Sequence, residues 1–215
     1  MIKFLFAGRR APGRTRHAAQ HHLQHGHGRA VVMPPPDSGP MPIDYVQNHV
    51  LDGSYPGVGH HAIERDLMTE LWFEDLAHLR ASVATPYYQQ VLRPDEPRFV
   101  DDATVAKMQV DPVLIKDGRR TRCKLAWLLT HEETDRDLLP ATSMADFQRI
   151  VLNRVAPPPD GPAFVTTVIE AWHDDLDAVR RHADHWPFDD RIDRTRSLGL
   201  LLEEFTTTRL RDSFV

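Results

Sequence analysis

Two heptapeptides decide the fold: residues 70–76 read ELWFEDL and residues 170–176 read EAWHDDL. In each, an extended run with a central Trp meets two acidic residues. Acidic side chains favour a helix N-terminus because the positive end of the helix dipole lies there. The same strand-to-helix junction therefore occurs twice, and internal similarity at long spacing is typical of duplicated units. We predict a chain built from two related α+β halves.

The elements around the first junction predict a ferredoxin-like unit with the order βαββαβ. Apolar runs of strand length alternate with stretches of helical periodicity, and the loop MPPPDSGP at residues 33–40 excludes helix and central strand. In chain order we expect a strand at 2–7, a helix at 14–27, strands at 43–51 and 66–73, a helix from 74 onward, and a strand at 104–115.

The second half is predicted to follow the same plan in a degenerate form. We expect a strand at 122–129, a helix that begins at 143 and carries Phe147 to Val155, a strand at 164–172, a helix at 174–186 and a last strand at 198–210. The stretch before Phe164 is too short for a clear second strand. The predicted domains are residues 1–116, with the active site, and residues 117–215.

The reason for a duplication lies in the exposed face of such a sheet. A four-stranded antiparallel sheet with helices on one side leaves an apolar face and open edges. A second, similar sheet facing the first buries both. The expected architecture is therefore a pair of antiparallel sheets that face each other as an α/β barrel, and the expected oligomeric state is a monomer or a homodimer.

Composition excludes several classes of function. The chain has 215 residues, 41% of them hydrophobic, and a net charge of −5, which disfavours a sequence-independent grip on nucleic acid. The single cysteine, Cys123, cannot form an internal disulfide, and no apolar run reaches the length of a membrane span. These features favour a cytoplasmic protein without a nucleic-acid or membrane partner. A small-molecule substrate is the remaining partner.

Five short motifs in the first half resemble the EthD family of dimeric α/β-barrel proteins. They are MIKFL at 1–5, HGHGRAV at 25–31, YVQNHVL at 45–51, ELWFEDL at 70–76 and DEPRFVD at 95–101. In this resemblance the family's helix-end histidine corresponds to His27, and its second-strand histidine to His49. His22 and Leu23 stand where the family has aromatic residues, and Arg29 stands where it has a proline. The resemblance implies a cofactor-independent small-molecule enzyme or an accessory protein of degradation.

His27 and His49 are the candidate catalytic residues. Imidazole can take up and return a proton near neutral pH. If His27 ends its helix, the dipole favours its protonated form, and a plain C-cap is the alternative interpretation. Tyr45 and His49 share one strand face by the period of two, which would suit an oxygenated aromatic ring; a solvated strand face is the alternative.

The candidate substrate-binding residues are Tyr45, His22, Trp72 and Trp127, and for the two tryptophans a core position is the alternative. Glu70 recurs as Glu170, which favours a structural role. Asp95 and Glu96 are interpreted as solvated or helix-capping acids.

A metal site is not expected. His17, His21 and His25 could together hold a divalent ion, but they climb one helical stripe and do not converge, and no HExxH motif occurs.

From these observations we expect a lyase or cyclase of natural-product biosynthesis that acts on a polyketide-like or aromatic intermediate without a cofactor. Dehydration, decarboxylation and cyclisation are the reactions that the resemblance implies. A cofactor-free monooxygenase that forms a quinone would use the same base and is the second hypothesis. The third is a non-catalytic protein that binds a small molecule.

Overall fold

The computed structural model describes residues 1–54, 64–131, 145–159, 161, 163–184, 188 and 190–206. Its described residues divide into two compact units. Unit 1 holds residues 1–49 and 65–109 together with 205–206, and unit 2 holds the described residues of 50–64 and 110–204. Each unit combines antiparallel strands with helices, so the predicted α+β class is confirmed.

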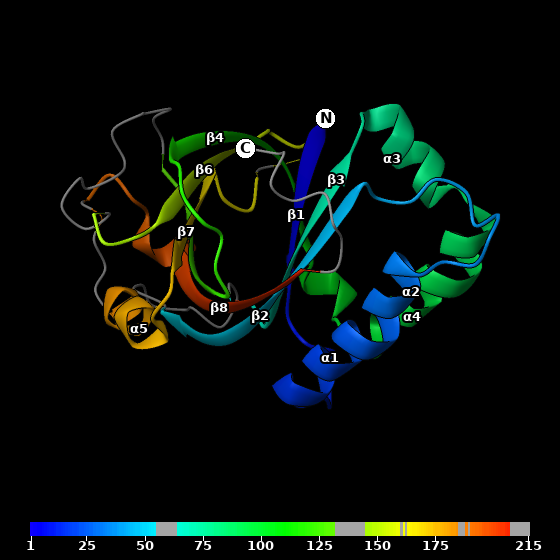
Figure 1. Cartoon of the computed structure of the whole chain (residues 1–215), viewed down its shortest axis with the longest axis horizontal. Helices are drawn as coiled ribbons and strands as arrows, with labels where there is room; N and C mark the ends of the chain where they lie inside the picture. Colours follow the sequence, from blue (N-terminus) through cyan, green and yellow to red (C-terminus); the bar gives the residue numbers. More distant parts are fainter. Residues whose placement is uncertain are drawn as a thin grey trace. The chain divides into compact units, whose positions relative to one another are not determined.

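Unit 1 is a four-stranded sheet with helices on one side (Figure 1). Its strand order is β4-β1-β3-β2, and the pairs β1–β3 and β2–β3 are antiparallel. The strands are β1 (Ile2–Gly8), β2 (Asp44–Ser54), β3 (Leu67–Phe73) and β4 (Ala106–Lys116); β2 and β4 run on into unit 2. The predicted strands at 2–7, 43–51, 66–73 and 104–115 match them closely.

The first helical segment of unit 1 is longer than predicted. It begins as α1 (Arg16–His22), where the Thr15 hydroxyl caps the Ala18 amide, and passes through a π-helical turn, Leu23–His27, into α2 (Gly28–Val32). The predicted end at His27 is therefore wrong. Gly28 keeps a right-handed helical backbone with φ −62°, so the chain has no reason to stop there.

The second helical segment of unit 1 follows β3. It comprises α3 (Leu76–Val83), a π-helical turn (Tyr88–Leu92), α4 (Arg93–Asp95) and two short 3-10 turns, Glu96–Arg98 and Asp102–Thr104. The Asp75 side chain caps α3 by accepting from the His78 amide. The acidic junction thus starts the helix, as the sequence predicts.

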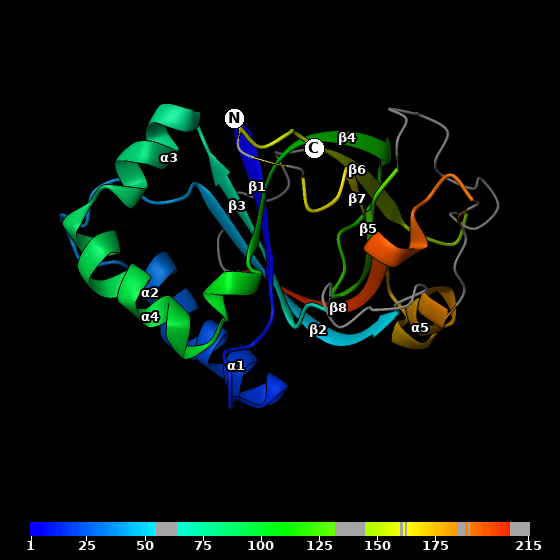
Figure 2. The same cartoon turned by 180° about the vertical axis from the view of Figure 1, so that it is seen from behind.

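Unit 2 has the strand order β8-β5-β7-β6, with the C-terminal part of β4 beyond β6. Its strands are β5 (Cys123–Leu129), β6 (Arg149–Val155), β7 (Thr167–His173) and β8 (Leu198–Thr206). The helix α5 (Leu176–Asp184) contacts β5 and β7 (Figure 2). A 3-10 turn, Arg194–Arg196, precedes β8.

The helix predicted from residue 143 is wrong where the structure describes it, because Arg149–Val155 is a strand. β6 pairs with β4 on one side and β7 on the other, and four consecutive residues, Ile150 to Asn153, are buried, so both faces of the strand are covered. A strand buried on both faces loses its polar alternation and cannot be told from a buried helix by periodicity. Residues 143–144, 185–186 and 207–210 of the predicted elements lie outside the described residues.

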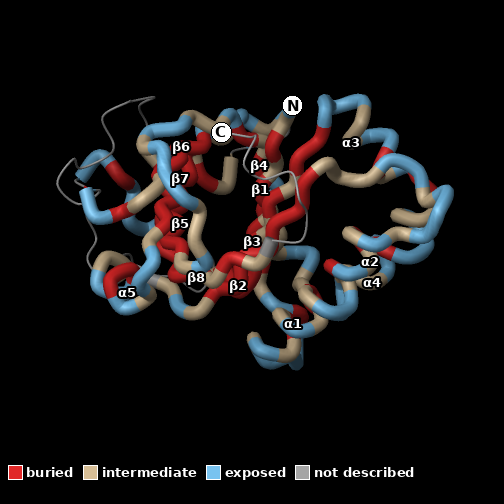
Figure 3. The backbone as a smooth tube through the Cα atoms, viewed as in Figure 1, coloured by how far each residue is buried: buried red, intermediate tan, exposed pale blue. Residues whose placement is uncertain are grey.

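Each unit buries a lysine–glutamate–asparagine cluster on the sheet face that points away from the helices. In unit 1, Lys3 Nζ lies 3.0 Å from Glu70 Oε2, and Asn48 Nδ2 donates to Glu70 Oε1 at 3.2 Å. In unit 2 the matching residues are Lys124, Glu170 and Asn153, with distances of 2.7 and 2.9 Å. All six residues are buried (Figure 3 shows the strands in red).

Candidate functional site

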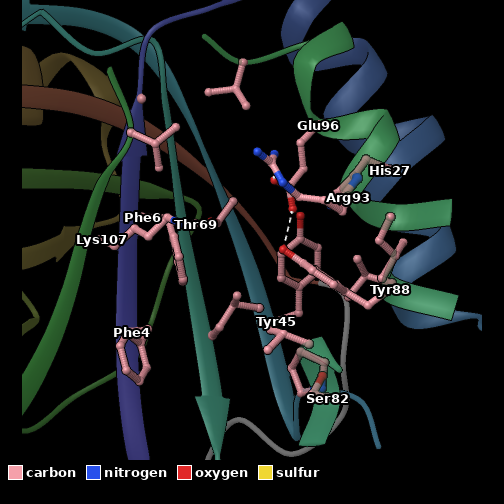
Figure 4. Close-up of a pocket in the computed structure, with 18 of the residues that line it drawn as sticks. Phe4, Phe6, His27, Tyr45, Thr69, Ser82, Tyr88, Arg93, Glu96 and Lys107 are labelled. Carbon is pink, nitrogen blue, oxygen red and sulfur yellow. Dashed lines mark hydrogen bonds and ion pairs between the residues drawn. The ribbon is translucent and has the colours of Figure 1, made fainter. Parts of the chain in front are cut away.

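A cavity of about 430 Å³ lies in unit 1 between the sheet and the helices (Figure 4). Alternating side chains of the strands form its floor, because successive residues of a strand point to opposite faces. Phe4 and Phe6 of β1 and Thr69 and Leu71 of β3 point into the cavity, whereas Lys3, Glu70 and Trp72 belong to the other face. The volume is within the range typical of small-molecule sites.

Few polar groups interrupt the apolar lining. His27 comes from the π-helical turn, Tyr45 from β2, Tyr88 and Arg93 from the second helical segment, and Glu96 from the turn after α4. Lys107 of β4 and Asp102 stand at the lining as well. Apolar walls with a small number of placed polar groups are typical of sites that orient an organic ligand.

The π-helical turn positions His27. Gln47 of β2 is fully buried and its amide donates to the Leu23 carbonyl at 3.1 Å. Gly28 allows this approach, since a Cβ there would lie 1.9 Å from Gln47 Nε2 and 2.7 Å from the Leu23 carbonyl oxygen. The helix is thus held against β2 at the residue that follows His27, and the imidazole is carried to the cavity wall.

His27 is mostly buried and has an acidic neighbour. Its side chain is 11% exposed, its ring lies 4.9 Å from the Phe99 ring, and Nδ1 lies 3.3 Å from Asp95 Oδ2. Burial lowers the pKa of His27 below its ordinary value; Asp95 opposes this shift and His22 adds to it. The dipole argument for a protonated His27 therefore fails, because the helix continues past it. A neutral imidazole suits a base.

Two tyrosines and a carboxylate meet opposite His27 (Figure 4). The Tyr88 hydroxyl donates to Glu96 Oε1 at 3.0 Å, and Arg93 donates to Glu96 Oε2 at 2.6 Å. Burial and the Glu96 charge raise the pKa of Tyr88 to about 12. Burial also raises the pKa of Tyr45, whose hydroxyl accepts from the Gln47 amide at 3.4 Å. Both phenols therefore stay protonated. Tyr45 accepts from Gln47 and can donate its own proton to a ligand oxygen, whereas Tyr88 already donates its proton to Glu96.

The other predicted site residues do not line the cavity. His49 Nε2 lies 3.3 Å from Gln47 Oε1 and its ring packs 4.5 Å from Phe205, so the structure does not bring His49 to the cavity with His27. His22 stands behind the wall and contacts Asp95. Trp72 belongs to the opposite sheet face, and Trp127 lies in the core of unit 2. Catalytic and binding roles for these residues stay predictions.

Sequence reasoning missed the residues contributed by positions 84–98. Tyr88 and Arg93 fall between the predicted elements, and Asp95 and Glu96 were expected to be solvated or capping acids. Instead Glu96 lines the cavity and Asp95 contacts two histidines. The motif DEPRFVD contained the signal, but only the packing of α4 against α1 shows which partners its acids meet.

The exposed histidine stripe has the predicted geometry. The rings of His17 and His21 lie 6.2 Å apart, and those of His21 and His25 lie 4.6 Å apart. Across the described part of the chain, no group of three or more His, Cys, Asp or Glu side chains is arranged to hold a metal ion. No helix in those same residues combines the length and hydrophobicity needed to cross a membrane.

The chain is similar to known proteins in sequence over residues 11–103 and in fold over its whole length. Residues 11–103 match the EthD domain. Among solved structures, the chain is similar to an anthrone oxidase-like protein at a TM-score of 0.61 and 10% identity, covering 100% of this chain and 96% of that one. A protein from Lactobacillus acidophilus NCFM with a provisional monooxygenase name gives a TM-score of 0.47 at 10% identity, covering 96% and 99%. No curated protein matches the sequence.

The match confirms the predicted EthD resemblance and corrects the predicted reaction. The lyase or cyclase hypothesis is wrong: the EthD match, together with the oxidase-like name of the structure at a TM-score of 0.61, fits the second hypothesis instead. The error arose because an acid–base histidine is common to both reaction classes, so the residues alone did not separate them.

Proposed function

The chain carries an EthD domain over residues 11–103, and from that premise we propose that it is a cofactor-independent oxygenase of an enolisable, hydroxylated aromatic compound. The single observation that carries the proposal is His27, a buried imidazole of lowered pKa at the wall of an aromatic-lined cavity that also holds two protonated phenols. A similar structure is named an anthrone oxidase-like protein, which makes anthrone the first substrate to test.

The proposed reaction begins with proton transfer to His27. The neutral imidazole removes a proton from the methylene carbon of the substrate, and the electron pair moves onto the ketone oxygen as an enolate. Tyr45 is placed to donate a hydrogen bond to that oxygen, because its phenol keeps its proton well above neutral pH and accepts, rather than donates, in its contact with Gln47. Donors that meet developing charge in a dry site lower the barrier to enolisation.

Dioxygen then completes the reaction without an added reductant. The enolate carbon bonds to dioxygen and supplies both electrons, which gives a peroxide anion. The imidazolium of His27 returns its proton to the terminal oxygen. Loss of water from the hydroperoxide converts the original methylene into a carbonyl. One substrate and one dioxygen therefore yield one quinone and one water.

Dioxygen uptake with anthrone tests this proposal. We expect consumption of one dioxygen per quinone formed and no turnover under anaerobic conditions. His27→Ala should lower kcat by about 10²-fold or more, the usual contribution of a positioned base. His25→Ala is the matched control, because His25 is exposed on the same helical segment and does not line the cavity. Anaerobic turnover, or equal rates in both variants, would contradict the proposal.

We also propose that residues 1–116 and 117–215 are tandem copies of one ferredoxin-like unit. The strand orders β4-β1-β3-β2 and β8-β5-β7-β6 support this, since the second repeats the first position by position. The buried Lys3–Glu70–Asn48 cluster and its counterpart in unit 2 occupy corresponding strand positions, which adds a side-chain argument to the topological one. In this proposal the first copy holds the active site.

A further inference from the structure

Asp95 lies beside the cavity without lining it, and its carboxylate contacts the side chains of His22, Arg98 and His27. His22 Nε2 lies 2.9 Å from Oδ1 and 3.0 Å from Oδ2, and Arg98 donates to Oδ1 at 3.1 Å. His27 Nδ1 lies 3.3 Å from Oδ2. Two neighbours therefore hold the carboxylate in place, and the third contact reaches the proposed base.

The contact with His27 has consequences for the imidazole. A carboxylate at Nδ1 favours the tautomer that carries its proton there, which leaves Nε2 as the basic nitrogen. The 3.3 Å contact lacks hydrogen-bond geometry, and His27 Nδ1 has no hydrogen-bond partner among the described residues. Catalytic hydrogen bonds often tighten only when substrate binds. Phe99 packs against both His22 and His27, at 5.8 and 4.9 Å between ring centres, and limits rotation of the two rings.

We propose that Asp95 is a positioning residue, which shares its carboxylate between His22 and His27 and fixes His27 with Nε2 as the base. The catalytic role of Asp95 rests on the proposed oxygenase function. The array of Asp95, His22 and His27 is present in the structure whether or not that function holds. His22 and His27 contact the same carboxylate. Besides burial, which lowers the pKa of His27, Asp95 raises it and His22 lowers it.

The charged and titratable groups around His27 are few. His22 lies on its own helical segment, Asp95 lies on α4, and Arg98 acts through Asp95. The remaining groups reach the same cavity from the other elements: Tyr45, Arg80, Tyr88, Arg93, Glu96, Asp102 and Lys107. Among all of these, Asp95 and His22 are the charges that act on the pKa of His27.

Nitrogen-15 NMR of the histidine rings, followed across a pH titration of the whole chain, tests the array without any substrate. In the wild type we expect neutral His27 to carry its proton on Nδ1. Asp95→Asn keeps an acceptor and removes the charge, so the pKa of His27 should fall by about one unit, the size typical of a lost opposite charge. Asp95→Ala should also abolish the Nδ1 preference. His22→Asn should move the pKa upward.

Glu74→Gln is the matched control, because it removes an exposed carboxylate of the same unit that does not line the cavity. Should Asp95→Ala fail to fold, the isosteric Asp95→Asn and His22→Asn variants still decide the sign of both shifts. An unchanged tautomer and pKa of His27, with only a lower melting temperature, would reduce Asp95 to a link between helices and overturn the proposal.

Activity provides a separate readout. If the oxygenase proposal holds, the acid limb of the kcat profile should move to lower pH in Asp95→Asn together with the NMR pKa. Absence of dioxygen uptake would end the functional proposal and leave the NMR result standing. An unshifted NMR pKa beside an active enzyme would end only the role of Asp95.

Discussion

The helix-facing side of the sheet is hollow in unit 1 and filled with side chains in unit 2. Unit 1 leaves a cavity there, bordered by Phe6, Tyr45 and Thr69. Unit 2 fills the same side with a continuous core of Trp127, Phe147, Ile150, Ile169, Val179, Phe188 and Ile192. Phe6 pairs with Thr69 in unit 1, and Trp127 pairs with Ile169 in unit 2, so the registers correspond. At these corresponding positions unit 2 has Trp127 and Ile169 where unit 1 has Phe6 and Thr69, so larger or less polar side chains occupy the space that is hollow in unit 1.

The sheet faces that point away from the helices carry the same cluster of buried side chains in both units. Each has a lysine at the second residue of its first strand, bonded to a glutamate two positions before a tryptophan, and an asparagine that donates to the glutamate. The comparison teaches that the face with the buried polar cluster is alike in the two units, whereas the helix-facing side is where they differ. Unit 1 therefore has room for a ligand on a side of the sheet that is packed in unit 2.

Removal of the glutamate from one of the buried lysine–glutamate–asparagine clusters should produce the largest loss of unfolding free energy. Glu170→Ala removes the 2.7 Å partner of the fully buried Lys124, which keeps Glu204 Oε2 at 3.1 Å, and it also removes the carboxylate that accepts from Asn153. Breaking a buried ion pair typically costs about 3–5 kcal/mol, and the remaining contact with Glu204 places the expected loss at the lower end of that range. Glu70→Ala should cost a similar amount if the clusters are equivalent. Denaturant unfolding at neutral pH measures both.

Glu203→Ala is the control for these variants. Glu203 pairs with Arg122 at the surface, with side chains 31% and 64% exposed, and such pairs contribute about 0–1 kcal/mol. A loss in Glu170→Ala no larger than in Glu203→Ala would break the comparison, because the buried clusters would then not be structural.

An intermediate difference is expected at corresponding positions of β3 and β7. Ile169 is fully buried in the core of unit 2, and Ile169→Ala should lower the free energy of unfolding by about 2–5 kcal/mol, since it opens a new void. Thr69 borders an existing cavity, so Thr69→Ala should cost less than about 1 kcal/mol. Equal losses by calorimetry would mean that the hollow of unit 1 is packed as tightly as the core of unit 2.

The smallest expected effect is a dependence of stability on pH that belongs to unit 1. Burial lowers the pKa of folded His27 below its ordinary 6.5, so the unfolded chain binds more protons in that window. The stabilisation is fully present above pH 6.5 and is lost as the pH falls toward the folded pKa. His27→Gln should therefore flatten the decline of unfolding free energy on mild acidification. An unchanged slope would contradict the burial of a neutral imidazole.

Much of unit 1 followed from local sequence pattern. The strands at residues 2–7 and 66–73 were predictable because apolar runs ended at turn residues, and the start of α3 was predictable because Asp75 caps it. His27 and Tyr45 could be chosen in advance as site residues. The strand β6 could not, because consecutive residues of β6 are buried on both faces of the sheet, which removes the alternation that identifies a strand.

The sequence by itself determined the α+β class, the βαββαβ order of the first half and the small set of imidazoles and phenols available for chemistry. Only the tertiary structure decided which of them share a cavity: His27 and Tyr45 line it and His49 does not. It also decided that Asp95 meets His22 across 73 residues of chain. The physical reason is that periodicity assigns a side chain to a face, whereas the packing of helices on the sheet decides where that face is hollow.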